Sequence, residues 1–197
     1  PEFTGPLAGG GTFSTDMIER WTVVYVWGMW CADCMADAPY VAALAADVRE
    51  MWDIDFLSVH VPASQTRISD EELYGKFGSI EAYFEEKGYA YPVVVDQTAD
   101  LRELLRVSWT PTYLLVDPDG IVRGFRSDLS VAGGEPVSDF LSDVETVRAA
   151  DRKAKYGAFE AGALTIGPDG ASGLTGQTPF TVEAMTAAFP GMEVITD

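Results

Sequence analysis

Along the first 150 residues, segments with the apolar pattern of buried strands alternate with segments that have the apolar spacing of helices. Residues 22–27 (Thr-Val-Val-Tyr-Val-Trp) are a nearly continuous apolar and β-branched run, and residues 54–61 and 91–96 predict a second and a third strand. Runs of this kind are typical of strands buried on both faces of a sheet. Between the first two runs, residues 33–51 carry apolar side chains at a helical spacing. The pattern therefore predicts a helix between two buried strands.

Cap and turn residues place the remaining elements. A polar segment with a Ser cap and early acids predicts a helix over 69–87, and shorter periodic stretches predict helices over 99–107 and 135–150. The sequence Asp-Pro-Asp-Gly joins two apolar runs, 113–116 and 121–125, and predicts an antiparallel hairpin. This order of strands and helices predicts the fold class: an α/β domain with a central mixed β-sheet flanked by helices.

Composition changes after about residue 155. The segment becomes rich in Gly, Ala and Thr, with a short helix predicted over 182–189 and a strand in Met-Glu-Val-Ile-Thr. We therefore divide the chain into a domain of residues 1–150 and a C-terminal extension of residues 151–197. This extension either wraps around the first domain or begins a second module, and the sequence leaves both open.

Charge excludes two classes of partner. The net charge is −18 and the pI is about 4.2, so nucleic acid and anionic membrane surfaces would repel the protein. No apolar run approaches the roughly 18 residues that a membrane-spanning helix needs, and no secretory leader pattern is present. A membrane anchor upstream of residue 1 stays open.

The only two cysteines are Cys31 and Cys34. A loop this short makes a weak structural staple, because the stabilisation from a disulfide grows with loop length. Zinc needs about four ligands, and the chain adds only one histidine, the distant His60. We predict no metal site and no cofactor, and we interpret Cys31-Ala-Asp-Cys34 as a redox pair.

The position of the pair suggests its mechanism. Cys31 falls where a buried strand turns into a helix, and the N–H groups at a helix start stabilise a thiolate. Cys34 lies one turn further on, within reach of a mixed disulfide on Cys31. We therefore predict that Cys31 attacks a disulfide and that Cys34 resolves the intermediate.

Three stretches carry a family resemblance: Val-Val-Tyr-Val-Trp-Gly-Met-Trp-Cys-Ala-Asp-Cys-Met-Ala-Asp-Ala-Pro-Tyr, Tyr-Pro-Val-Val-Val-Asp, and Val-Ser-Trp-Thr-Pro-Thr-Tyr-Leu-Leu-Val-Asp-Pro-Asp-Gly-Ile-Val. They resemble the thioredoxin-like fold, in particular the TlpA/ResA/DsbE group of thiol–disulfide oxidoreductases, over residues 1 to about 149. The resemblance implies a cis bond before Pro111, which faces the cysteines and leaves the Thr110 backbone free to pair with substrate. It also implies that Trp30 and Trp109 border the substrate groove. A buried packing role for Trp109 is the alternative.

Two acidic residues near the cysteines are expected to influence their proton transfer and redox properties. The group has Glu where this chain has Asp37, and the resemblance implies that this acid transfers protons with the resolving cysteine. An ordinary exposed acid of the first helical turn is the alternative. Asp33 lies between the cysteines, where a carboxylate disfavours a neighbouring thiolate. Since this favours the disulfide form of the protein, we predict a reductant, although a solvated Asp33 with little effect stays open.

The leading functional prediction is an enzyme that reduces disulfides of client proteins outside the cytoplasm. The resemblance implies a periplasmic or membrane-anchored setting, clients that include apocytochrome c, and a membrane or thioredoxin-type electron donor. A thioredoxin-like binding or redox-sensing module without turnover is the alternative. A peroxidase of the peroxiredoxin type is a third reading, but the Pro-x-x-x-Thr/Ser-x-x run it needs before Cys31 is missing.

Overall fold

The computed structural model describes residues 2–129 and 134–156. The helix predicted over 182–189 and the strand predicted in the last six residues lie outside this part of the chain. The chain divides into two compact units, residues 1–147 and 148–197. The domain boundary that we placed at residue 150 stays a prediction.

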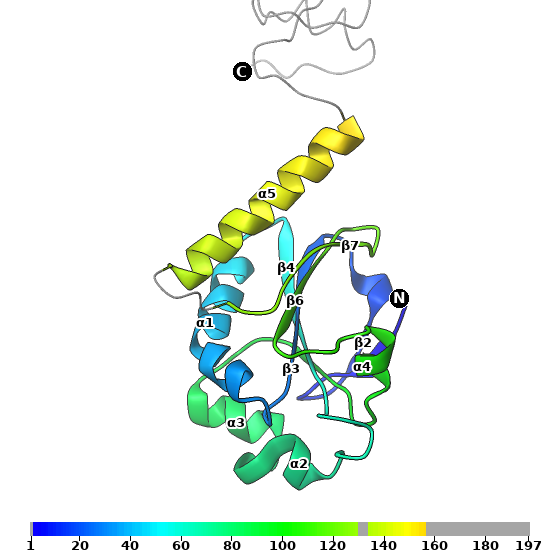
Figure 1. The fold of residues 1–197 in the computed structure, drawn as a ribbon, viewed down its shortest axis with the longest axis vertical. Coiled ribbons are helices and arrows are strands. Elements are labelled where there is room, and N and C mark those ends of the chain that lie inside the picture. The colour runs from blue at the N-terminus through cyan, green and yellow to red at the C-terminus, as the bar shows by residue number, and fades with distance from the viewer. Residues whose placement is uncertain (1, 130–133, 157–197) are drawn as a thin grey trace, which may run out of the picture. The chain divides into compact units, whose positions relative to one another are not determined.

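A five-stranded mixed sheet forms the centre of the first unit (Figure 1). The strand order is β5-β4-β3-β6-β7, with β3, β4 and β5 parallel and with β6 antiparallel to both β3 and β7. The predicted α/β class with a mixed sheet is therefore confirmed. The strands are β3 (Trp21–Trp27), β4 (Ile54–His60), β5 (Val93–Val95), β6 (Thr112–Val116) and β7 (Val122–Arg126).

The central strand β3 supplies side chains to both faces of the sheet. Val23, Tyr25 and Trp27 belong to one buried cluster, and Val24 and Val26 belong to another. Such alternation follows from the two-residue period of a strand. A strand covered on both faces is apolar at nearly every position, which explains the run recognised in the sequence.

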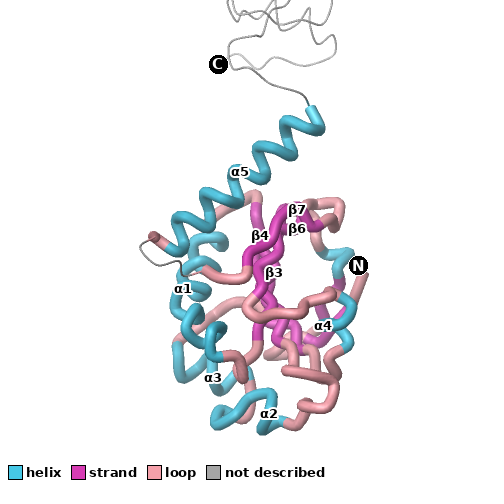
Figure 2. The backbone as a smooth tube through the Cα atoms, viewed as in Figure 1, coloured by secondary structure: helices cyan, strands magenta, loops and turns pink. Residues whose placement is uncertain are grey.

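Helices and a small hairpin cover the two faces, as Figures 1 and 2 show. The Tyr25 face is covered by α1, by α3 and by the first part of α5. The Val24 face is covered by α4 and by the hairpin β1–β2. The bounds are α1 (Ala32–Arg49), α3 (Ile80–Lys87), α4 (Asp100–Leu104), α5 (Pro136–Tyr156), β1 (Thr4–Pro6) and β2 (Thr12–Ser14).

The single helix predicted over 69–87 is wrong. The segment forms α2 (Asp70–Tyr74), a 3₁₀ turn η2 (Gly75–Phe77) and then α3. Gly75 and Gly78 have positive φ angles of 54° and 73°, a conformation that ends helices. Ser79 then caps α3 through its hydroxyl, which accepts from the Ala82 N–H.

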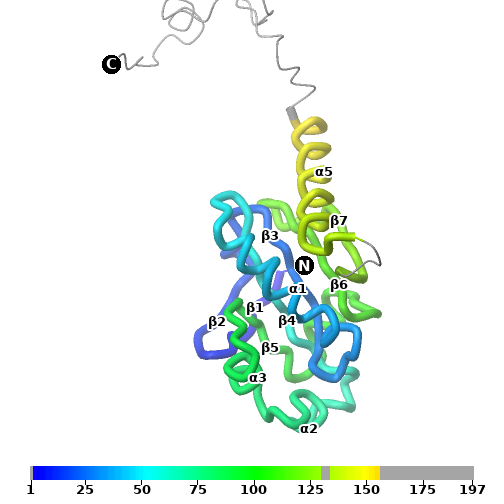
Figure 3. The backbone as a smooth tube through the Cα atoms, turned by 90° about the vertical axis from the view of Figure 1, so that its left-hand side faces the viewer, coloured from blue at the N-terminus to red at the C-terminus, as the bar shows by residue number. Residues whose placement is uncertain are grey.

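The N-terminal hairpin was not foreseen. β1 and β2 pair antiparallel and lie beside β5 (Figure 3). Leu7 forms an isolated bridge to Val94 of β5. Gly5 allows this approach, since a Cβ there would overlap the Val94 side chain. The predicted β6–β7 hairpin is confirmed, and its turn is held by Asp117, whose carboxylate accepts from the Asp119 and Ile121 N–H groups, both at 2.9 Å. Among the described residues, no helix combines the length and apolar character needed to cross a bilayer.

Candidate active site

The cysteine pair lies at the junction between β3 and α1, as predicted. Cys31 is the N-cap of α1, and its Sγ accepts from the Cys34 N–H at 3.2 Å. Cys31 and Cys34 form a disulfide, with 5.3 Å between their Cα atoms. A sulfur at this position receives an N–H from the first helical turn and faces the positive end of the helix dipole, so the arrangement stabilises a thiolate on Cys31 once the disulfide opens.

Exposure differs between the two sulfur-bearing residues. Cys34 is completely buried, whereas Cys31 retains 7% of its surface. Both residues are buried, but Cys31 is the more exposed of the two. This asymmetry supports the predicted roles, with Cys31 as the attacking residue and Cys34 as the resolving residue.

The loop before β6 faces Cys31. The Thr110–Pro111 peptide bond is cis, as the resemblance implied, and the Thr110 carbonyl oxygen lies 3.3 Å from the Cys31 Sγ. Trp109 is 60% exposed, so the buried packing role considered for it is wrong. Trp109 directly precedes Thr110, and its role at the edge of a substrate groove stays a prediction.

Trp30 is half-buried and fixed in orientation. Its indole N–H donates to the Val61 carbonyl at 2.7 Å. Gly28 makes room for the ring, because a Cβ at that position would overlap the indole. The guanidinium of Arg102 lies over the ring, 5.5 Å from its centroid, a cation–π contact. Trp30 therefore forms a fixed wall beside Cys31.

Arg102 is a residue that sequence reasoning missed. Its guanidinium donates to the carbonyls of Pro62 and Ala63 at 2.8 and 2.6 Å, and to that of Val107 at 3.3 Å. It thereby joins the loop after β4 to the loop that leads to Thr110. Nothing in the pattern of α4, a short helix with Leu101 as its buried residue, distinguishes this arginine from a surface residue.

Asp37 is buried, with 3% of its surface exposed, so the alternative of an exposed first-turn acid is wrong. Its carboxylate accepts from the Tyr113 hydroxyl and from the Leu129 N–H, both at 2.9 Å. Tyr113 stacks on Tyr25 with 4.9 Å between ring centroids. These contacts place a polar cluster one helical turn beyond Cys34, and its proton-transfer role stays a prediction.

Burial changes the acidity of the two tyrosines in this cluster. It raises the pKa of both Tyr25 and Tyr113 well above the ordinary value, and the nearby Asp37 carboxylate adds to the effect. Both hydroxyls therefore remain protonated. The Tyr25 hydroxyl points to the Cys34 carbonyl at 3.5 Å, so the cluster reaches the backbone of the resolving cysteine. Tyr113 was not predicted as a site residue, although its place two residues after Pro111 in an alternating strand is a signal.

His60 lies beneath the loop that carries the pair. It is completely buried, and its Nε2 accepts from the Met29 N–H at 3.2 Å. Burial lowers its pKa to about 4, an effect that a backbone contact to Leu73 partly offsets. The imidazole is therefore neutral, and its unprotonated Nε2 can accept the hydrogen bond from the Met29 N–H. Its burial and its hydrogen bond to Met29 indicate a structural role.

Asp33 is exposed on the first turn of α1. Water and salt screen a charge in that position. Its influence on the redox pair stays a prediction, and we expect it to be small.

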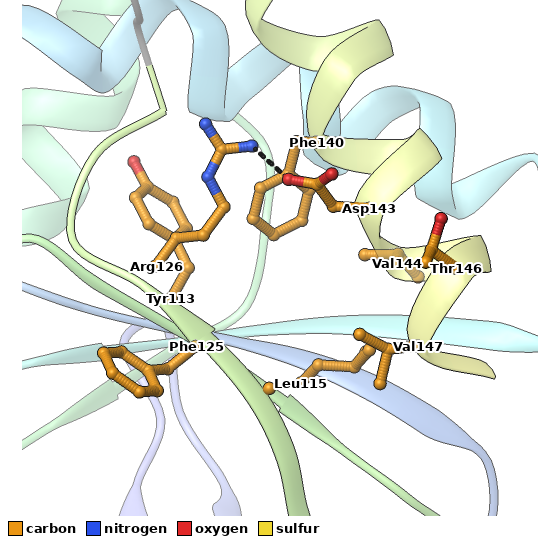
Figure 4. A pocket seen from close by; sticks show the side chains of 10 residues that line it. Tyr113, Leu115, Phe125, Arg126, Phe140, Asp143, Val144, Thr146 and Val147 are labelled. Atoms are coloured by element: carbon orange, nitrogen blue, oxygen red, sulfur yellow. Dashed lines mark hydrogen bonds and ion pairs between the residues drawn. The ribbon is translucent and has the colours of Figure 1, made fainter. Parts of the chain in front are cut away.

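An apolar hollow lies behind the polar cluster, between β6, β7 and α5 (Figure 4). Its volume is about 250 Å³. Tyr113, Leu115 and Phe140 line it, and an ion pair of 3.1 Å between Arg126 and Asp143 borders it (Figure 4). Tyr113 thus belongs both to the polar cluster and to the lining of the hollow.

A mixed sheet, a Cys-x-x-Cys pair at the start of α1 and a facing cis-proline loop together define a thioredoxin-like protein with a redox-active disulfide. Residues 1–125 match the model of the AhpC/TSA family, and the chain belongs to that family. The resemblance to the TlpA/ResA/DsbE group is confirmed by the proteins that the chain matches.

Among these is the thiol–disulfide oxidoreductase ResA of Geobacillus thermodenitrificans, which is 25% identical over 124 residues, covering 62% of this chain and 64% of that protein. The chain spans about half to two thirds of the length of the curated ResA proteins it matches.

Solved structures show the same fold. StoA from Bacillus subtilis superposes with a TM-score of 0.56 at 16% identity, covering 74% of this chain and 96% of StoA. The lipoprotein thioredoxin Etrx1 from Streptococcus pneumoniae gives a TM-score of 0.55 at 22% identity, covering 74% of this chain and 99% of Etrx1.

Proposed function

We propose that this protein is a disulfide reductase that acts on client proteins outside the cytoplasm. The observation that carries the proposal is the position of the Cys31 sulfur. It lies between the N-terminus of α1 and the Thr110 carbonyl, where an extended client backbone can pair with the loop. The ResA proteins support the same chemistry, because they are named thiol–disulfide oxidoreductases.

The reaction consists of two thiol exchanges. The Cys31 thiolate attacks one sulfur of the client disulfide, and the other client sulfur leaves as a thiolate. The Cys34 thiolate then attacks the Cys31 sulfur and releases the second client thiolate. The client gains two electrons and two protons, and the protein is left with the Cys31–Cys34 disulfide. A dithiol donor, of membrane or thioredoxin type, must then restore both thiols.

Asp37 has a suitable place in the second step. Cys34 must lose its proton in a fully buried environment, where a charged sulfur is costly without a nearby base. Asp37 lies one turn further along α1, and its carboxylate is held by Tyr113 and Leu129. We assign it the transfer of this proton, directly or through one water molecule.

The relatives support an extracytoplasmic setting, and the client class is a proposal that rests on the family resemblance. A persistent client disulfide requires an oxidising compartment, and DsbE-like and lipoprotein thioredoxins share this fold. We place the protein in the periplasm or a corresponding extracytoplasmic space. Apocytochrome c before haem attachment is the client class that we propose.

Reduction of insulin by the purified protein, with dithiothreitol as the source of electrons, tests the activity. Wild-type protein should accelerate the precipitation of the insulin B chain, and Cys31→Ser should abolish the acceleration. A redox-sensing or binding module would show no turnover that depends on Cys31, and that result would reject the proposal.

Clients are identified by trapping. Cys34→Ser expressed with an export signal should accumulate mixed disulfides on Cys31, with Cys31→Ser as the matched control. Apocytochromes among the trapped proteins would support the client class. Trapped partners without any cytochrome would contradict it.

A further inference from the structure

A second cavity lies next to the loop that carries Thr110. A cavity of about 570 Å³ opens between the loop after β4 and the segment from α4 to Ser108. Thr66, Arg102, Arg106 and Ser108 line it, together with the carboxylate of Glu103. One wall is continuous with the site, since Arg102 contacts Trp30 and Ser108 precedes Thr110 by two residues.

Arg106 is the free cation of this cavity. It is exposed, and no ion pair or side-chain hydrogen bond joins it to any described residue. Arg102 differs, because carbonyl oxygens occupy its guanidinium. Carbonyls do not cancel its charge, so two positive charges face one negative charge, Glu103, in a protein whose net charge is −18.

The backbone of Arg106 is strained. Its φ angle is +54°, in the left-handed region that disfavours residues with a Cβ and suits glycine. A glycine at this position would relieve the strain and lose the cation. An arginine here is therefore not explained by the local fold.

We propose that this cavity is a subsite for an acidic side chain of the client, with Arg106 as the cation that binds it. This inference rests on the proposed function. An extended client that pairs beside Thr110 advances about 3.3 Å per residue, so a side chain two to four residues from its attacked cysteine reaches the cavity. Arg106 then selects among clients without taking part in the thiol exchange.

Two disulfide-linked peptides test the proposal. They differ only in having Glu or Gln three residues from the attacked cysteine. Dithiothreitol keeps the full-length protein reduced, and kcat/KM for each peptide is obtained from the appearance of peptide thiols above the rate without protein. Wild-type protein should prefer the Glu peptide by about twofold to fivefold, the range expected for an exposed ion pair. The preference should decline as NaCl is raised from about 0.02 to 0.5 M.

Arg106→Gln should remove the preference by lowering kcat/KM for the Glu peptide alone. Arg106→Gly should do the same while the unfolding midpoint stays equal or rises. Arg49→Gln is the matched control, because it changes the net charge equally at the C-terminal end of α1, a helix about 27 Å long that begins at the cysteine pair.

Equal rates with both peptides in the wild type, or an equal effect of Arg49→Gln and Arg106→Gln, would overturn the subsite while leaving the reductase intact. If neither peptide is reduced at all, the proposed function itself fails.

Discussion

The two faces of the sheet are built from different chemistry. The cluster that contains Val24 and Val26 is aliphatic, with Leu57, Val59 and Val94 as its centre. The opposite cluster is aromatic, and rings from β3, β6 and α3 stack there in succession. Several buried polar groups lie on this second face, close to the cysteines. Asp37, His60 and the tyrosine hydroxyls all lie there.

The difference separates residues that only stabilise the fold from residues that contact the structure around the cysteines. Aliphatic side chains hold the sheet together and need no partners, whereas each buried polar group needs one. On the aromatic face these partners lie in the structure around the cysteines: Met29 binds His60, and the Cys34 carbonyl faces Tyr25. We therefore expect substitutions on the aliphatic face to alter stability alone, and those on the aromatic face to alter both stability and turnover.

The largest effect is expected from Leu57→Ala on the aliphatic face. Leu57 is buried, and truncation of a buried leucine costs about 2–5 kcal/mol of unfolding free energy. Urea denaturation measures this loss, and insulin reduction below the unfolding transition measures turnover. Turnover should remain at the wild-type level. A marked loss of turnover in the folded variant would remove the distinction between the faces.

A second effect concerns His60 and pH. The unfolded chain takes up a proton near pH 6.5, whereas the folded protein resists it down to about pH 4. The unfolding free energy should therefore fall as pH is lowered through this window, by about 3 kcal/mol in all. Since His60 is the only histidine, the decline above pH 5 should belong to it. His60→Gln should flatten the profile there, and an unchanged slope would contradict the assignment.

A smaller effect is expected from Tyr113→Phe. The change removes a hydroxyl from the buried Asp37 carboxylate, which costs about 1–3 kcal/mol of stability. It should also slow the release of a mixed disulfide, measured by stopped-flow with an oxidised peptide. Tyr40→Phe removes an exposed hydroxyl and is the control. Release at the wild-type rate would mean that Asp37 and Tyr113 are structural only.

The smallest effect is expected from Asp33→Asn. Removing the carboxylate favours the thiolate and should raise the reduction potential. Because Asp33 is exposed, the increase should be less than about 20 mV. Equilibration with glutathione buffers measures it. A decrease in potential would contradict the predicted tuning of the protein toward a reductant.

Features encoded locally were predictable from the sequence. The apolar run of β3, the cysteines at its end and the Asp-Pro-Asp-Gly turn each depend on a few adjacent residues. Features that depend on distant contacts were not predictable. The helix break at residues 75–79 was missed because the residues on both sides favour a helix. The β1–β2 hairpin was missed because it depends on the approach of Gly5 to Val94, a residue distant in the chain.

The same division applies to the site. Cys31, Cys34 and Pro111 stand in recognisable motifs. The burial of Asp37 requires Tyr113 and Leu129, which are 76 and 92 residues away in the chain. Arg102 binds backbone carbonyls, and the pattern of side chains in the sequence does not predict where these carbonyls lie.

The most direct test of the central claim is a brief iodoacetamide pulse on the reduced protein, followed by peptide mass spectrometry of the two cysteines. The structure predicts that Cys31 is alkylated well before Cys34, because Cys31 is the more exposed residue of the two and the start of α1 stabilises its sulfur as a thiolate. Faster modification of Cys34, or equal inertness of both thiols, would contradict the account.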